Sequence, residues 1–336
     1  MRMFRPSAGL LPGAMATLCV SGLSAFADDL RSTQVLVEGG VFLAHAETEA
    51  AFARLDAPKP DANALLPKLT AYWEGGGASF GQAGSARRIG SGGSTSQMRL
   101  GAERGFNGAI VGAMASAGFG SVGSGDLGSQ TIGQHVDLYG RVDRGSFFTK
   151  LLFGGSMFDF SSIRRGPDDD ASKASAMSYG ARAAAQFGAN LSLRGVKVTP
   201  TVSLATYANR LGGYDECGGA TPFDFNARWA TAAVGSFRLN GSRSFRVGPT
   251  QDVELRGFLG TEDVLGYSAT RAAAVDSSGV RQRLARESAP TGRGVVGGLG
   301  VGTTLAPGIS MTVDYDYGRR DSVSTHSSRA RLGVSF

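Results

Sequence analysis

The sequence has few residues in an arrangement that supports catalysis. A histidine held near a serine and an acid would point to a hydrolase, but no G-x-S-x-G motif occurs. His135 and His326 are far apart in the sequence, and ordinary hydrogen bonding to solvent or neighbours accounts for both positions. We therefore predict that the chain is not an enzyme.

Cofactor and metal motifs are equally sparse. The spacing Gly118-x-Gly120-x-x-Gly123 fits a dinucleotide-binding loop, but further glycines follow where a helix should begin. The two cysteines, Cys19 and Cys217, are too few for a disulfide framework or a cysteine-rich zinc site. We predict no cofactor and no bound metal.

The composition suggests glycine within regular structure. Of the 336 residues, 51 are glycine and only 11 are proline, while 42% are hydrophobic and 18% are charged. Beyond the N-terminus, no apolar run reaches the ~20 residues of a membrane-spanning helix. The formal charge of +6 is a statement about solubility and attraction for anions, so it leaves both nucleic acid and anionic lipid open as partners. Together with the export signal and the strand pattern described below, this charge leads us to expect lipid and no nucleic acid.

The N-terminus has the pattern of a secretory signal peptide. Arg2 and Arg5 form a basic region, Ala8 to Leu23 is rich in small and apolar residues, and Ala25-Phe26-Ala27 is an A-x-A cleavage site. We predict that residues 1–27 are removed. The mature chain is then only mildly basic and is exported from the cytoplasm.

The rest of the chain alternates between apolar and polar residues with a period of two, which is typical of strands with two different faces. In the segment from Thr131 to Arg144, the even positions are largely apolar and the odd positions include His135 and Asp137. The segments from Ile309 to Tyr317 and from Ala330 to Phe336 show the same pattern. Strands therefore dominate the structure.

A membrane barrel explains this pattern better than a soluble sandwich. The alternating runs extend over ~10 residues, enough for a tilted strand to cross a bilayer. Along the chain, short turns such as 143–146 also alternate with longer loops such as 164–173, 210–224 and 266–293. Polar interior positions suit a water-filled lumen and would disrupt a sandwich core.

We predict an all-β fold, a transmembrane antiparallel up-and-down β-barrel of about twelve strands. The first and the last strand should both have their free chain ends on the periplasmic side, with the long loops outside the cell. The predicted strands begin near Tyr72, Thr95, Gly108, Ile132, Ser146, Ala174, Leu191, Phe225, Val253, Gly294, Ile309 and Thr325.

Three stretches resemble the translocator barrel of classical (type V) autotransporters. They are Tyr72-Trp-Glu-Gly-Gly76, Val198-Thr-Pro-Thr-Val-Ser-Leu204, and Ile309-Ser-Met-Thr-Val-Asp-Tyr-Asp-Tyr-Gly318 followed by Ala330 to Phe336. They are similar to that family's first strand, its "LTP-x-x-x-L" strand and its closing hairpin with a terminal aromatic. The resemblance covers residues 71–336.

This resemblance implies a location, partners and an assembly signal. It implies the outer membrane of a Gram-negative bacterium, reached by Sec-type export, and partners in the barrel-assembly machinery and periplasmic chaperones. The last strand is similar to the signal that this machinery reads by strand pairing. Its lipid-facing residues are Ala330, Leu332, Val334 and Phe336.

The segment before the barrel, residues 28–70, is too short for an independent passenger domain. Residues 33–55 favour a helix, which Pro58 and Pro60 would end. In the resembled family a helix before the first strand threads the pore, and we predict the same here; a helix lying loose in the periplasm is the alternative. Only Asn63 is present where an Asn-Asn pair would indicate self-cleavage.

We therefore predict a monomeric translocator or pore domain of autotransporter type with little or no passenger. The alternative is a passive porin-like or structural surface barrel without an export role. The residues expected to line the pore are His135, Asp137, Arg141, Lys150, Arg182, Asp314, Asp316, Arg329 and Arg331.

Arginine pairs fall in segments expected just outside the membrane. The guanidinium group binds phosphate in a bidentate manner, and lipopolysaccharide is dense in phosphate. Ordinary solvated loop charge is the competing explanation. The residues expected to contact lipopolysaccharide are Arg87, Arg88, Arg164, Arg165, Arg319 and Arg320.

Overall fold

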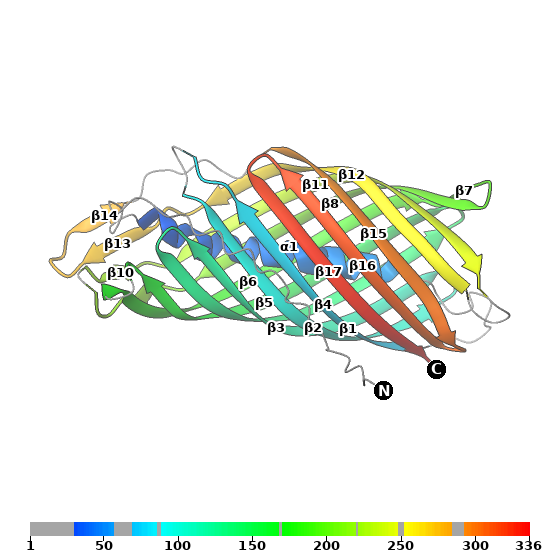
Figure 1. Ribbon diagram of the computed structural model, residues 1–336, viewed down its shortest axis with the longest axis horizontal. Coiled ribbons are helices and arrows are strands. Elements are labelled where there is room, and N and C mark those ends of the chain that lie inside the picture. The colour runs from blue at the N-terminus through cyan, green and yellow to red at the C-terminus, as the bar shows by residue number, and fades with distance from the viewer. Residues whose placement is uncertain are drawn as a thin grey trace, which may run out of the picture.

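A computed structural model shows a closed antiparallel barrel with one helix inside it (Figure 1). It describes residues 30–56, 69–85, 89–167, 170–219, 221–247, 252–283 and 292–336. Several predicted features lie outside the described residues: the signal peptide, Pro58 and Pro60 after the helix, Asn63, Arg87 and Arg88. Within the described part of the chain, neither helix has a stretch long and apolar enough to cross a membrane.

Twelve long strands form the barrel wall, each paired with its neighbours in the sequence. The first strand pairs with the last, from Thr70 opposite Ser335 to Gln82 opposite Val323, and this pairing closes the barrel. The strands are β1 (Leu69–Gln82), β2 (Ser91–Phe106), β3 (Ala109–Ser124), β4 (Leu127–Arg144), β5 (Phe147–Arg165), β6 (Ser172–Ala189), β8 (Val196–Leu211), β11 (Arg228–Arg246), β12 (Asp252–Ala269), β15 (Arg293–Ala306), β16 (Ile309–Arg320) and β17 (Val323–Ser335).

The period of two decides which side chains face outward. On β4, Val136 and Leu138 are 63% and 61% exposed on the outer surface, whereas the intervening Asp137 is 1% exposed. The long strands thus turn mainly apolar residues outward and most of their charged residues inward. The predicted fold class is confirmed.

Two predicted strands differ from the observed ones. The strand expected near Leu191 consists of a short arm, β7 (Leu191–Leu193), that turns back onto the long strand β8. The strand expected near Phe225 begins at Arg228, and Phe225 itself lies in another sheet. Both corrections arise because apolar and polar residues also alternate in parts of the loops. The period of two alone therefore does not locate the first residue of a wall strand.

The two ends of the barrel are built differently. At the terminal end, which contains Leu69 and Phe336, tight turns such as 107–108, 145–146 and 307–308 join the strands. At the opposite loop end, two long connections form a second sheet, the loop cap. Its strands are β9 (Tyr214–Asp215), β10 (Phe223–Phe225), β13 (Ala273–Asp276) and β14 (Arg281–Arg283).

The loop cap has an aromatic core. The Tyr214 and Phe225 rings stack with their centroids 4.7 Å apart. Arg228, which is fully buried, donates from Nη1 to the Thr33 hydroxyl at 2.8 Å and from Nη2 to the Tyr214 hydroxyl at 3.3 Å. Burial raises the pKa of Tyr214 to about 12, so its phenol stays protonated near neutral pH. The cap therefore covers the N-terminal end of the helix.

The helix α1 (Gln34–Asp56) follows a short 3-10 turn, η1 (Leu30–Thr33), and runs through the barrel from the loop end to the terminal end. Its apolar residues are not confined to one face, because the wall surrounds it. Leu36, Phe52 and Leu55 are each at most 3% exposed. The helix expected over residues 33–55 is thus present and lies inside the barrel.

Candidate functional site

The candidate site is the lumen, where the helix meets the wall through charged pairs. At its centre, the Glu47 carboxylate is fully buried and accepts from Arg99 on β2, from Nε at 2.9 Å and from Nη2 at 2.5 Å. Ser116 donates its hydroxyl to the same carboxylate at 3.2 Å. A buried carboxylate needs such partners because desolvation disfavours its charged form.

This pair is part of a larger network in the wall. Arg99 Nη1 also donates to Glu74 on β1 at 2.8 Å, and Arg331 on β17 donates to the other oxygen of the Glu74 carboxylate. One end of the network is therefore the helix and the other is the seam between the first and last strands. The helix thus shares its charge partners with the strands that close the barrel.

A second cluster lies where the helix ends. Asp56 accepts from the fully buried Lys150 at 2.6 Å and from Arg141 at 3.1 Å. Arg54 pairs with Glu103 at 2.7 Å and lies over the Tyr72 ring. Charges of both signs on the helix thus have complementary partners on several different strands, which fixes its depth and rotation.

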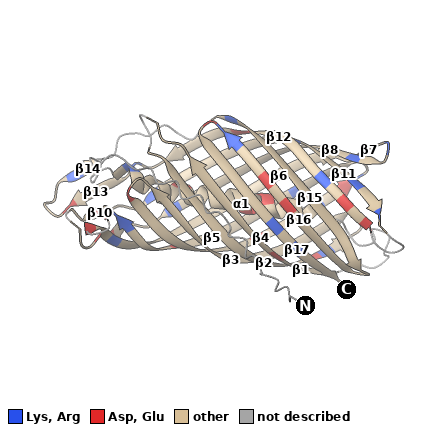
Figure 2. Cartoon of the chain, viewed as in Figure 1, with Lys and Arg blue, Asp and Glu red and all other residues tan. Residues whose placement is uncertain are grey.

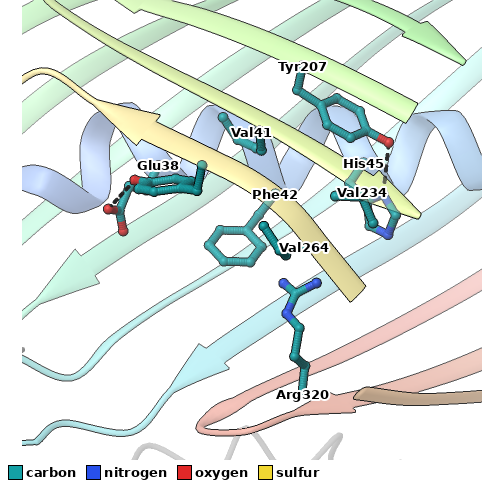
Figure 3. A pocket seen from close by; sticks show the side chains of 10 residues that line it. Glu38, Val41, Phe42, His45, Tyr207, Val234, Val264 and Arg320 are labelled. Atoms are coloured by element: carbon teal, nitrogen blue, oxygen red, sulfur yellow. Dashed lines mark hydrogen bonds between the residues drawn. The ribbon is translucent and has the colours of Figure 1, made fainter. Parts of the chain in front are cut away.

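A third cluster lies nearer the loop end. The two nitrogens of His45 contact the Tyr207 hydroxyl at 2.9 Å and Glu262 at 3.1 Å, and Figure 3 shows the His45 and Tyr207 side chains pointing toward one another. Glu49 pairs with Arg238 on the same side of the helix. The cavity beside His45 is about 30 Å³, room for about one water molecule.

Close packing also joins the helix to β8. Asn209 donates from Nδ2 to the Val37 carbonyl at 2.9 Å and accepts from the Ser178 hydroxyl at 2.8 Å. A Cβ atom at Gly40 would lie 2.3 Å from Asn209 Nδ2, so the approach requires glycine. Ser178 is fully buried, and the helix shields this stretch of the inner wall from solvent.

The helix does not fill the lumen evenly. Cavities of about 30, 80 and 110 Å³ lie between it and the strands that run from β8 through β17 to β1. The largest of these three lies at the helix end, where Asp56, Arg256 and Asp314 are among its lining residues. The sequence predicted a water-filled lumen, whereas in the structure the helix occupies much of it and these cavities lie beside the helix.

The residues expected to line the pore all lie on inner faces of their strands. Arg182 pairs with Asp137 at 2.6 Å and contacts His135 at 3.1 Å. Arg329 pairs with Asp316. The others have partners that the sequence did not indicate, namely Asp56 for Lys150 and Arg141, Glu74 for Arg331, and Arg256 for Asp314.

The arginine pairs expected to contact lipopolysaccharide divide into inward and outward members. Arg165 is 3% exposed and pairs with Glu216 of the cap at 2.6 Å, and Arg320 pairs with Glu262 at 2.9 Å. Neighbouring residues of a strand point to opposite sides, so only one of each pair faces outward. The prediction is therefore corrected for Arg165 and Arg320, whereas Arg164 and Arg319 are exposed.

Figure 2 shows charged residues within the long strands as well as at the ends of the barrel. Their inward placement explains how a membrane wall carries them, since a charge on the lipid face costs about 2 to 4 kcal/mol at the bilayer centre. Several inward charged residues were not predicted from the sequence. For those in the wall, the period of two along each strand was a signal that could have identified them. They are Glu38, Glu47, Glu49, Arg54 and Asp56 of the helix, and Glu74, Arg99, Glu103, Arg238, Arg256 and Glu262 of the wall.

Comparison with known proteins identifies the barrel. The family model of the autotransporter beta-domain matches residues 72–316, most of the wall. The chain belongs to the autotransporter beta-domain family. Autotransporter beta-domains reside in the outer membrane of Gram-negative bacteria and rely on the barrel-assembly machinery, so the long strands here span that membrane.

Solved autotransporter domains have the same fold. The translocator domain of NalP from Neisseria meningitidis matches with a TM-score of 0.70 and 16% identity, over 90% of this chain and 98% of that chain. The beta domain of the Bordetella autotransporter BrkA matches with a TM-score of 0.59 and 16% identity, over 80% of this chain and 99% of that chain. A search of the curated proteins found no significant match.

Proposed function

We propose that this autotransporter beta-domain is a translocator pore closed by its own N-terminal helix, with the loop end outside the cell and residues 1–27 a cleaved signal peptide. The observation that carries the proposal is the fully buried Glu47 bound to Arg99. A carboxylate has no reason to be buried at mid-lumen unless the helix belongs there in the resting state.

The other helix contacts support the same resting state. Ion pairs at Arg54 and Asp56 hold the terminal end of the helix, and the loop cap covers its beginning. An open, porin-like surface barrel is not favoured, because the helix occupies most of the space that a conducting channel needs.

Removing the helix should open the pore. We expect the intact protein to conduct weakly in planar lipid bilayers, through the space left beside the helix, and a chain lacking residues 28–55 to conduct much more. A second readout is a cysteine at Ser178, which should resist a water-soluble thiol reagent in the intact protein and react after the deletion, with Cys217 replaced by serine throughout.

A cysteine at Met177 is the matched control, because it lies on the outer face and should not change. Equal conductance of the two chains would reject the closed-pore proposal. Reactivity of Ser178→Cys in the intact protein would show that the helix is not seated in the lumen.

We further propose that Arg164 and Arg319 contact lipopolysaccharide phosphate at the loop end. Both side chains are exposed, and Lys173 lies directly opposite Arg164 on the next strand, so positive charge gathers on the outer surface there. Several cations near one phosphate strengthen its binding through charge-assisted hydrogen bonds.

Replacing Arg164 and Arg319 with glutamine should reduce the lipopolysaccharide that co-purifies with the barrel. It should also lower thermal stability in lipopolysaccharide micelles but not in neutral detergent. The control is Arg104→Gln, an exposed arginine at the terminal end, where no lipopolysaccharide is expected. Equal losses of stability in both media would mean that the two arginines serve the barrel fold instead.

We also propose that the chain has no catalytic role, acts as a monomer and reaches the membrane with periplasmic chaperones. The hydrogen-bonded series Glu262, His45 and Tyr207 has the chemistry of a proton relay, but the two cavities that His45 lines are about 30 and 80 Å³, well below the ~300 Å³ of a small ligand site. Among the described residues, no group of three or more His, Cys, Asp or Glu side chains is arranged to hold a metal ion.

A further inference from the structure

The outer apolar surface of the barrel has a similar height on three strands spread around the wall, β4, β6 and β15. Outward residues are apolar or glycine from Ile132 to Val142 on β4 except Gln134, from Met177 to Phe187 on β6, and from Val295 to Leu305 on β15 except Thr303. At ~3.3 Å per residue and a tilt of ~40°, each of these runs spans about 25 Å, which is the height of the apolar band of an outer-membrane barrel.

The band is shorter where the barrel closes. On β17 the outward residues are apolar from Phe336 only to Ala330, and on β1 they are apolar from Leu69 only to Trp73. The same estimate gives about 15 Å for β17 and about 10 Å for β1. The residues above them are polar or lack side chains, and we call them the polar notch. They are Gly75, Gly77 and Ser79 on β1, Ser94 and Ser96 on β2, and His326 and Ser328 on β17.

The strand register places these residues side by side. Ser79 lies opposite both His326 and Ser94, and Gly77 lies opposite both Ser328 and Ser96. The notch is therefore one continuous patch on the outer wall, on the β17, β1 and β2 strands that face the viewer in Figure 1. It is not a consequence of a missing wall, because pairing between the three strands is unbroken.

Aromatic side chains mark the border of the notch. On β16, Tyr315 and Tyr317 are 49% and 39% exposed and lie directly opposite Ser328 and His326. The Tyr315 hydroxyl is 2.8 Å from His326 Nδ1, and the Tyr317 and His326 ring centroids are 5.0 Å apart. Tyrosine is typical of the membrane–water interface, so these rings indicate an interface at the level of Ser328.

From these observations we propose that the β17–β1–β2 seam thins the outer membrane, drawing lipid headgroups of the outer leaflet down to the polar notch. Hydroxyl and imidazole groups are costly to place in hydrocarbon, whereas headgroups and their water can hydrogen-bond to them. A bilayer adapts to a short apolar surface by thinning, at modest cost per ångström. The apolar residues below the notch, Trp73 and Leu332 among them, keep this side of the barrel in the membrane.

A matched pair of tryptophan probes tests the proposal. Ala330 and Ala181 are both exposed alanines, equally far along their strands from the terminal-end aromatics Phe336 and Phe187. With Trp73 and Trp229 replaced by phenylalanine, Ala330→Trp and Ala181→Trp are refolded into phosphatidylcholine vesicles brominated either near the headgroups or near the bilayer centre. Bromine quenching then reports the depth of each probe.

We expect the central bromines to quench Ala181→Trp most strongly and the shallow bromines to quench Ala330→Trp most strongly, a shift of about 10 Å that follows from the shorter band. Ser328→Trp provides a second probe within the notch should Ala330→Trp not refold. Equal depths for Ala330→Trp and Ala181→Trp would overturn the proposal. Protection of the seam probe from both bromine positions would also overturn it, because a protein surface rather than lipid would then cover the notch.

Discussion

Replacing Glu47 by leucine should release the helix from the lumen much more often. The substitution removes the buried partner of Arg99, and breaking a buried pair costs about 3 kcal/mol or more, which raises the open population about a hundredfold. The measurement is the open probability in single-channel recordings, with thermal unfolding of the refolded barrel as a second readout. Arg99 retains Glu74, so the wall itself should still fold.

Glu49→Leu is the matched control, since it removes the same group from the same helix. The Glu49 and Arg238 side chains are 19% and 12% exposed, compared with fully buried Glu47, so the loss should be about 1 kcal/mol. The double change Glu47→Leu and Arg99→Met should recover part of the loss, because no unpaired charge is then left at that point. Equal effects of the two single changes would show that the central pair does not hold the helix.

Deleting Phe336 should strongly reduce the amount of folded barrel in the outer membrane. Its amide donates to the Leu69 carbonyl at 2.9 Å, where the last strand meets the first, and its side chain is 75% exposed at the terminal rim. An aromatic residue at this level belongs to the interfacial girdle, and the strand it ends is the predicted assembly signal. Heat-modifiable mobility of the protein in membrane fractions measures the folded amount.

Phe147 provides a control, because it is 69% exposed on the strand that follows the terminal-end turn 145–146 but lies within the chain. Phe147→Ala should leave most of the folded barrel intact, and Phe336→Tyr should also assemble. A deletion of Phe336 that leaves the heat-modifiable band unchanged would contradict the role of the last strand as an assembly signal.

The wall was predictable because its pattern is local. A residue such as Val136 faces lipid and His135 faces the lumen through backbone alternation alone, so the sequence carries the information strand by strand. The helix was predictable for a related reason, since apolar and alanine-rich residues precede Pro58 and Pro60. The predicted and observed helices differ by a single residue at each end.

The contacts within the lumen were not predictable in the same way. The ion pair between Glu47 and Arg99 forms through the three-dimensional path of the chain, which no spacing in the sequence reveals. The same is true of the loop cap, where Phe223 on β10 lies opposite Asp276 on β13. The case of Arg165 shows a further limit. A bulge between Phe160 and Ile163, with Ser162 at a φ of 55°, reverses the alternation near the end of β5 and turns Arg165 inward.

The number of times the polypeptide passes through the barrel's height has a topological consequence. Helix α1 makes one passage and the twelve long strands make twelve more, so the described chain has an odd number of crossings. Leu30 and Phe336 therefore lie on opposite faces of the membrane. In the proposed orientation, with the loop end outside, Leu30 lies on the cell-surface side beside the loop cap, whereas the last strand ends in the periplasm. The polypeptide thus connects the two compartments while helix α1 lies inside the barrel.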